Sequence, residues 1–145
     1  MKIKWAKAYL PHFRCTVCIG KSVKIPTHLL LDTGSPFTPI LPKEYMRTRL
    51  KIKSTTNDPI HLAYAKFNKV PIKDEVIFRF ESSKGELIKI PYNKAIYLVP
   101  DNPSPSQMDT IKAIPSIIGI DFLKNIGLKF VLDPKQEIIY LEGSL

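Results

Sequence analysis

The sequence predicts an all-β domain built from short strands. Its 145 residues include 13 prolines but only six glycines, and proline spread along a chain disfavours long helices while it suits short strands and turns. Residues 12–19 alternate between apolar and polar side chains, as a strand with one buried face does. Other short apolar runs end at turn residues. A chain of this length and globular composition forms one domain, so we predict a single domain over residues 1–145.

In the N-terminal half, the strand around residues 11–20 is followed by a turn at 20–22 and by a second strand that runs through three leucines, residues 29–31. Residues 37–41 predict a short strand. Residues 42–47 predict one or two helical turns, because proline is favoured at the first helical position. Residues 51–70 are the most ambiguous, with strand indicated at 60–67.

In the C-terminal half, residues 76–80 and 87–90 predict a hairpin, and residues 95–99 another strand. The Pro- and Ser-rich residues 100–115 predict a long surface loop and a mobile segment. Residues 116–127 predict an apolar strand followed by a short helix that ends at Gly127. Residues 128–132 and 137–141 flank Asp-Pro-Lys-Gln, which predicts a terminal hairpin.

The formal net charge is +9, but the lysines and arginines are scattered rather than gathered in runs. A dispersed positive surface mostly serves solubility, so we do not expect a nucleic acid as partner. No segment has the length of a membrane span or the pattern of a signal peptide. The expectation is therefore a cytoplasmic protein without a membrane partner.

Cys15 and Cys18 have the spacing of some metal and redox motifs. Residues three apart on a strand point to opposite faces, however, and the three histidines are widely separated in sequence. Two small strand residues are therefore the favoured interpretation over a zinc or thiol site. No metal and no cofactor are predicted.

The segment Leu29–Pro36 carries the most distinctive chemistry. An apolar strand runs directly into Asp32, which is followed by Thr33, Gly34 and Ser35. An ionised aspartate is rarely buried without partners, and a tight turn after it can direct backbone N–H groups at the carboxylate. The simpler alternative is a strand that ends in a polar turn, since Asp and Gly are common turn residues.

The combination of Leu-Leu-Leu-Asp32-Thr33-Gly34-Ser35 with Ile117-Ile118-Gly119 and the helix after it resembles the two motifs of retropepsin-like aspartic proteases. The order of the predicted elements resembles that family over residues 10–141. The resemblance implies a closed acid-protease-type β-barrel with one short C-terminal helix, assembled as a two-fold homodimer.

The resemblance implies peptide hydrolysis by a water held between two carboxylates that share one proton. Two adjacent carboxylates acquire different pKa values, so one acts as base and the other as acid. The chain has a single Asp-Thr-Gly, and a two-lobed single-chain enzyme would need roughly twice this length. Asp32 of each subunit must therefore face its copy across the dimer axis, with a polypeptide as substrate.

The resemblance also assigns roles around the catalytic Asp32. Thr33 is expected to hydrogen-bond across the dimer axis, and Gly34 to donate its N–H to the carboxylate. The hydroxyl of Ser35 is expected to donate to the charged carboxylate, which implies an acidic pH optimum at about pH 3–6. Residues 117–119 are expected to pack behind the loop, and the strand 138–141, with N-terminal residues, to form the dimer interface.

The sequence departs from the resemblance in its flap. Viral flaps are rich in glycine, whereas no glycine lies between Ser35 and Val76. A flap is expected around residues 58–69, with Tyr64 as a contact to substrate. Two other hypotheses stay open: a catalytically inactive dimeric module that binds peptides or proteins on the same fold, and a basic β-barrel that binds nucleic acid.

Overall fold

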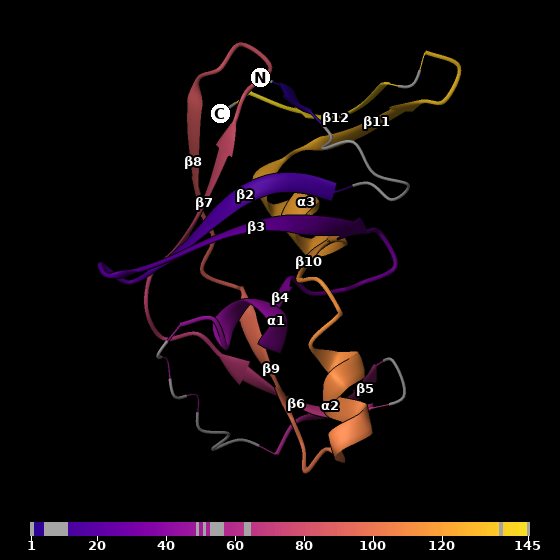
Figure 1. The fold of residues 1–145 in the computed structure, drawn as a ribbon. Coiled ribbons are helices and arrows are strands. Elements are labelled where there is room, and N and C mark those ends of the chain that lie inside the picture. The colour runs from indigo at the N-terminus through magenta and orange to yellow at the C-terminus, as the bar shows by residue number, and fades with distance from the viewer. Residues whose placement is uncertain are drawn as a thin grey trace.

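The structure is a computed structural model that describes residues 2–4, 12–48, 50, 52, 57–62, 65–136 and 138–144. These residues form 12 strands and three short helices, which confirms the predicted all-β class. The described strands pair into three separate sheets, and none of the three closes on itself. The closed barrel expected from the resemblance is therefore not seen in the strand pairing. Figure 1 shows the three sheets one above another.

The central sheet has five strands in the order β10-β3-β2-β7-β8. Strands β3, β2, β7 and β8 are antiparallel neighbours in that order, and β10 adds to β3 in parallel. Their bounds are β2 His12–Ile19, β3 Val23–Asp32, β7 Val76–Glu81, β8 Leu87–Pro91 and β10 Ile117–Gly119. The strands predicted at 11–20, 76–80, 87–90 and 116–119 are confirmed.

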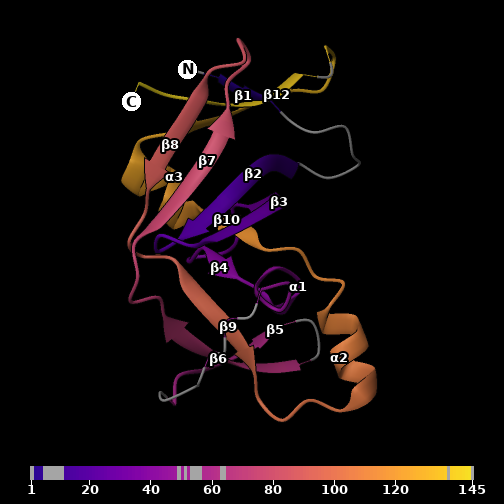
Figure 2. The ribbon, with the colours of Figure 1, turned by 60° about the vertical axis from the view of Figure 1, so that its left-hand side comes forward.

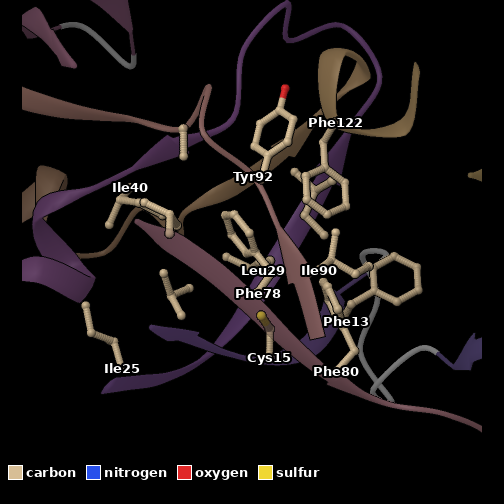
Figure 3. Packing of buried hydrophobic residues seen from close by; sticks show 14 of the residues in the cluster. Phe13, Cys15, Ile25, Leu29, Ile40, Phe78, Phe80, Ile90, Tyr92 and Phe122 are labelled. Atoms are coloured by element: carbon tan, nitrogen blue, oxygen red, sulfur yellow. The ribbon is translucent and has the colours of Figure 1, made fainter. Parts of the chain in front are cut away.

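One face of the central sheet covers the main core. The alternation predicted for β2 is confirmed, because Phe13, Cys15, Val17 and Ile19 are all buried. Figure 3 shows Cys15 among the rings of Phe13, Phe78 and Phe80. Burial of aromatic and branched side chains is the main favourable term in folding, at about 1.5–3 kcal/mol for each one.

The second sheet has the order β4-β9-β6-β5 and lies at the end of the molecule away from the termini (Figure 2). Its strands are β4 Pro39–Ile40, β5 Pro59–Leu62, β6 Ala65–Pro71 and β9 Ile96–Pro100. The helix α1 (Pro42–Tyr45) follows β4 and begins with proline, as predicted. Of the ambiguous residues 51–70, those in 59–62 and 65–70 belong to the antiparallel strands β5 and β6, while residues 51, 53–56, 63 and 64 lie outside the described residues.

The prediction of a long loop over residues 100–115 is wrong, because residues Pro105–Ile111 form the helix α2. The hydroxyl of Ser104 accepts from the N–H of Gln107, while the Gln107 side chain accepts from the N–H of Ser104. This capping box satisfies two N–H groups that a helix start leaves unpaired. Ile111 then anchors α2 in a second, smaller core with Leu41, Phe67, Leu98 and Ile117.

The third sheet joins the two ends of the chain, in the order β1-β12-β11. It consists of β1 Lys2–Lys4, β11 Lys129–Asp133 and β12 Ile138–Glu142, so the predicted terminal hairpin is confirmed. The helix α3 (Ile120–Ile126) leads into it and ends at Gly127, whose φ of 78° is left-handed. Glycine adopts this conformation without the steric cost that other residues have.

No helix among the described residues is long and apolar enough to cross a membrane.

Candidate active site

Asp32 is the last residue of β3, and its side chain is exposed. Successive side chains on a strand point to opposite faces, so Leu29 and Leu31 enter the main core while Leu30 and Asp32 share the other face. Leu30 is half-buried against the second core. Both faces of the leucine segment are thus at least partly covered, and the exposed carboxylate lies at the end of that segment.

The turn after β3 is held by backbone N–H groups that point toward Asp32. The N–H of Gly34 donates to Oδ1 of Asp32 at 2.9 Å, and the N–H of Ser35 donates to the Asp32 carbonyl at 3.1 Å. A Cβ added at Gly34 would lie 3.2 Å from the same Oδ1. The predicted bond from Gly34 to the carboxylate is therefore present, and it orients the carboxylate.

The side chain of Ser35 does not make the predicted bond to the carboxylate. Its hydroxyl donates instead to the carbonyl of Phe37 at 2.7 Å, and a serine hydroxyl has only one proton to donate. The carbonyl of Ser35 accepts from the N–H of Ile120 at 2.9 Å. Ser35 thus fixes the loop to itself and to the start of α3. The side chain of Thr33 is exposed.

Strand β10 lies directly beside the aspartate, with Gly119 opposite Asp32 in parallel register. Ile118 is buried in the main core and Ile117 in the second core, so β10 is anchored in both cores. A Cβ at Gly119 would lie 2.2 Å from the carbonyl oxygen of Phe37. The loop therefore passes so close to β10 that only glycine fits at position 119.

A polar network lies behind the loop and was missed by sequence reasoning. The N–H of Gly119 donates to the hydroxyl of Thr38 at 3.1 Å, and that hydroxyl donates to Asp121 at 2.9 Å. The second oxygen of Asp121 accepts from the hydroxyl of Tyr92, which also accepts from the side-chain amide of Asn125 at 3.2 Å. Burial, followed by the bond to Asp121, raises the pKa of Tyr92 to about 12.

A second group missed from the sequence is Glu44, whose side chain is 1% exposed. It accepts from the hydroxyl of Thr27 on β3 at 2.9 Å and from that of Ser116 at 2.5 Å. Ser116 also accepts from the N–H of Leu41 at 2.8 Å. Glu44 thereby ties α1 to β3 and to Ser116, which directly precedes β10.

The segment predicted as a flap contains the paired strands β5 and β6, but Tyr64 lies outside the described residues. Half-buried apolar side chains from this hairpin, from α2 and from the segment after α2 belong to the same cluster as Leu30. They are Ile60, Leu62, Met108 and Ile114. The face of β3 that presents Asp32 is therefore continuous with an apolar region.

The two cysteines do not form a joint site. Cys15 is buried in the core and Cys18 is half-exposed on the opposite face of β2, and both are free thiols. Burial raises the pKa of the Cys15 thiol strongly, so it stays protonated. Among the described residues, no group of three or more His, Cys, Asp or Glu side chains is arranged to hold a metal ion.

Neither the protein-family models nor the curated proteins compared with this chain gave a match. The geometry of the Asp32 loop is therefore the basis on which a function is proposed.

Proposed function

We propose that this protein is an aspartic endopeptidase that acts as a homodimer, with Asp32 of each subunit forming the catalytic pair. The observation that carries the proposal is the exposed carboxylate of Asp32 at the end of a buried strand, oriented by the N–H of Gly34 and flanked by Gly119. A carboxylate that the backbone orients and that is open to solvent can bind a water molecule or a substrate.

The chemistry needs a second carboxylate, and the second chain supplies it. Asp121 behind the loop has both oxygens occupied by the hydroxyls of Thr38 and Tyr92. The chain contains one Asp-Thr-Gly, and a two-fold axis beside Asp32 brings its copy face to face. The exposed residues Thr33 and Ile120 (43% exposed) next to the loop support a contact there.

In the proposed reaction, one carboxylate takes a proton from water while the other gives its proton to the carbonyl oxygen of the peptide bond. The water oxygen bonds to the carbonyl carbon and forms a tetrahedral intermediate. The C–N bond then breaks as the carboxyl group that took the water proton gives it to the nitrogen. The other carboxylate takes a proton back from a hydroxyl of the intermediate as the carbonyl forms again. Like charges held close cannot both ionise, which keeps one acid and one base available.

The apolar region beside Asp32 favours a polypeptide substrate with apolar residues around the scissile bond. Leu30 shares the face of Asp32, and Ile60, Leu62 and Met108 continue the same cluster. We infer that the hairpin β5–β6 closes over the substrate as a flap, and that the three-stranded terminal sheet takes part in the dimer interface. The exposed Leu132 on β11 (54%) supports that surface.

The test is cleavage of a peptide library by wild type and by Asp32→Asn, over about pH 3–8. We expect wild-type cleavage that a statine-type inhibitor blocks, and no cleavage by Asp32→Asn. Asp109→Asn is the matched control, because Asp109 is also exposed and followed by threonine but lacks the glycine. It should keep full activity. Cleavage that persists in Asp32→Asn excludes the proposal.

A second candidate is a dimeric module that binds extended peptides without cutting them. It is favoured by the hydroxyl of Ser35, which donates to Phe37 rather than to the carboxylate, and by the absence of glycine from the flap region. Saturable binding of a peptide that is never cleaved at any pH supports this candidate. Cleavage excludes it.

A further inference from the structure

The face of the central sheet turned away from the main core carries a hollow of about 370 Å³ beside the β7–β8 hairpin. Residues of β2, β7 and the hairpin line it, among them Arg14, Thr16, Arg79, Glu81, Gly85 and Leu87. None of these is used by the proposed peptidase chemistry. Arg14 on β2 is paired with His28 on β3. His28 lies four residues before Asp32, so the hollow is roughly 13 Å from Asp32 along the strand.

The strand register gathers basic side chains around this hollow. Thr16 is paired with Arg79 of β7, and Arg79 with Lys89 of β8. Arg14 lies two residues before Thr16 and therefore on the same face. Two guanidinium groups thus line one hollow, and Lys89 stands next to one of them.

The guanidinium of Arg79 lacks adequate acceptors. Among the described residues, its buried Nε has no hydrogen-bond partner, and one terminal N–H group reaches the sulfur of Cys18 at 4.0 Å. Within the part of the chain that the structure describes, the ion pairs are Lys66–Asp101 and Lys69–Asp58, so neither Arg79 nor Arg14 is paired with a carboxylate. A buried donor of a charged group without an acceptor costs stability.

We propose that this hollow is a binding site for a phosphate-type oxyanion, held between Arg14 and Arg79. The planar fork of an arginine matches two oxygens of a phosphate, and a dianion has enough oxygens to engage two such forks. A carboxylate has only two oxygens, so two bidentate arginine forks would have to share them. The hydroxyl of Thr16, between the two arginines, offers a further donor.

Glu81 places a negative charge beside the site, and this charge repels an anion. It lines the hollow, and its Oε1 lies 3.7 Å from the position of a Cβ at Gly85. The carboxylate is not within ion-pair distance of either arginine. It therefore weakens the binding of an anion, and its removal should strengthen it.

The experiment is titration of the full chain with inorganic phosphate, followed by isothermal calorimetry and by backbone amide NMR shifts. We expect saturable binding with shifts in β2, β7 and the β7–β8 hairpin. Arg79→Gln and Arg14→Gln should each weaken binding about tenfold or more, since each removes a charge-assisted bond. Glu81→Gln should tighten binding several-fold.

Lys112→Gln is the control, because Lys112 is exposed at the end of α2, far from the hollow. This substitution removes the same positive charge as the arginine substitutions do. It should leave the affinity unchanged. If Lys112→Gln weakens phosphate binding as much as the arginine substitutions do, the effect is one of general charge and the proposed site is wrong. The absence of saturable binding at about 10 mM phosphate overturns it too. Arg14 is exposed, so its variant is informative even if Arg79→Gln fails to fold.

Two further ligands define what the site recognises. Acetate should not compete with phosphate, and effective competition by acetate overturns the preference for a dianion. A phosphoserine peptide that binds more tightly than inorganic phosphate identifies the ligand as a phosphorylated polypeptide, whereas equal affinities identify the free anion.

Discussion

At the scale of single residues, the loop after Asp32 depends on one close approach between backbones. The carbonyl of Phe37 is held by the Ser35 hydroxyl and lies against Gly119 on β10. Gly119 in turn donates its N–H to Thr38. The positions of Asp32 and of the loop that follows it are therefore set by a glycine that is 87 residues away in the sequence.

Gly119→Ala is expected to destabilise the protein and to displace the loop. An added methyl group would overlap the Phe37 carbonyl, at 2.2 Å, and Asp121, at 2.6 Å, so backbone has to move. We expect a loss of about 2–4 kcal/mol in the free energy of unfolding, measured in urea, because only a shift of the backbone can remove the overlap.

Gly127→Ala is the matched control for this substitution. Its φ is also left-handed, at 78°, but an added Cβ meets nothing within 4 Å. Only the conformational cost remains, at about 1–2 kcal/mol. If Gly119→Ala is no more destabilising than Gly127→Ala, the close approach does not constrain the loop.

The residues around Asp32 differ in how far the sequence could reveal them. Local sequence was enough to predict Asp32, Gly34 and the strand Ile117–Gly119, because their chemistry or their apolar pattern lies within a few neighbouring residues. Glu44 is not readable, since its partners Thr27 and Ser116 are 17 and 72 residues away. A glutamate in a first helical turn is usually a favourable exposed charge, and nothing local distinguishes a buried one.

At the scale of elements, the strands were predictable and the helix α2 was not. Strand β2 was readable from its period-two burial pattern, and the helix α3 from the glycines at both its ends. In α2, the prolines and serines of residues 103–106 favour a loop when they are read singly. The structure uses Ser104 as N-cap and Pro105 in the first turn, positions where both residue types favour a helix.

The network around Asp121 joins three elements, since Thr38 precedes β4, Tyr92 follows β8 and Asp121 lies in α3. The pKa of Tyr92 is raised from 10 to about 12, chiefly by burial and then by its bond to Asp121. The protonated phenol is thus favoured in the folded state. Its contribution to stability is complete below pH 10 and is lost as the pH rises to about 12.

The free energy of unfolding of Tyr92→Phe is expected to fall less at alkaline pH than that of the wild type. The variant keeps the ring that packs on Phe122 at 4.9 Å and loses only the hydroxyl. At pH 8 it should be about 1–2 kcal/mol less stable, because Asp121 loses a donor. Urea unfolding at pH 8 to 11 measures both effects. If wild type and variant lose stability in parallel above pH 10, Tyr92 is not the group that titrates.

At the scale of the whole molecule, the three sheets divide the proposed tasks. The central sheet carries Asp32 at one end of β3 and the basic hollow toward the β7–β8 hairpin, while the second sheet and α2 supply the apolar region. The terminal sheet lies at the opposite end from α2 (Figure 2). Sequence periodicity cannot reveal this division into separate sheets, because it defines strand faces but not the long-range pairing of strands.

The proposed catalytic pair predicts how mixed dimers behave. If each active site needs Asp32 from both subunits, a dimer of one wild-type and one Asp32→Asn chain is inactive. Equal amounts of the two chains, exchanged to equilibrium at constant total concentration, should then give about a quarter of the activity of wild type alone, because only that fraction of dimers has two aspartates. An active site contained within one chain would give about half. Asp109→Asn mixed in the same way should leave the activity unchanged, and an analytical ultracentrifugation run on each mixture establishes that dimers are present. A strictly monomeric protein that still cleaves peptides would contradict the shared site directly.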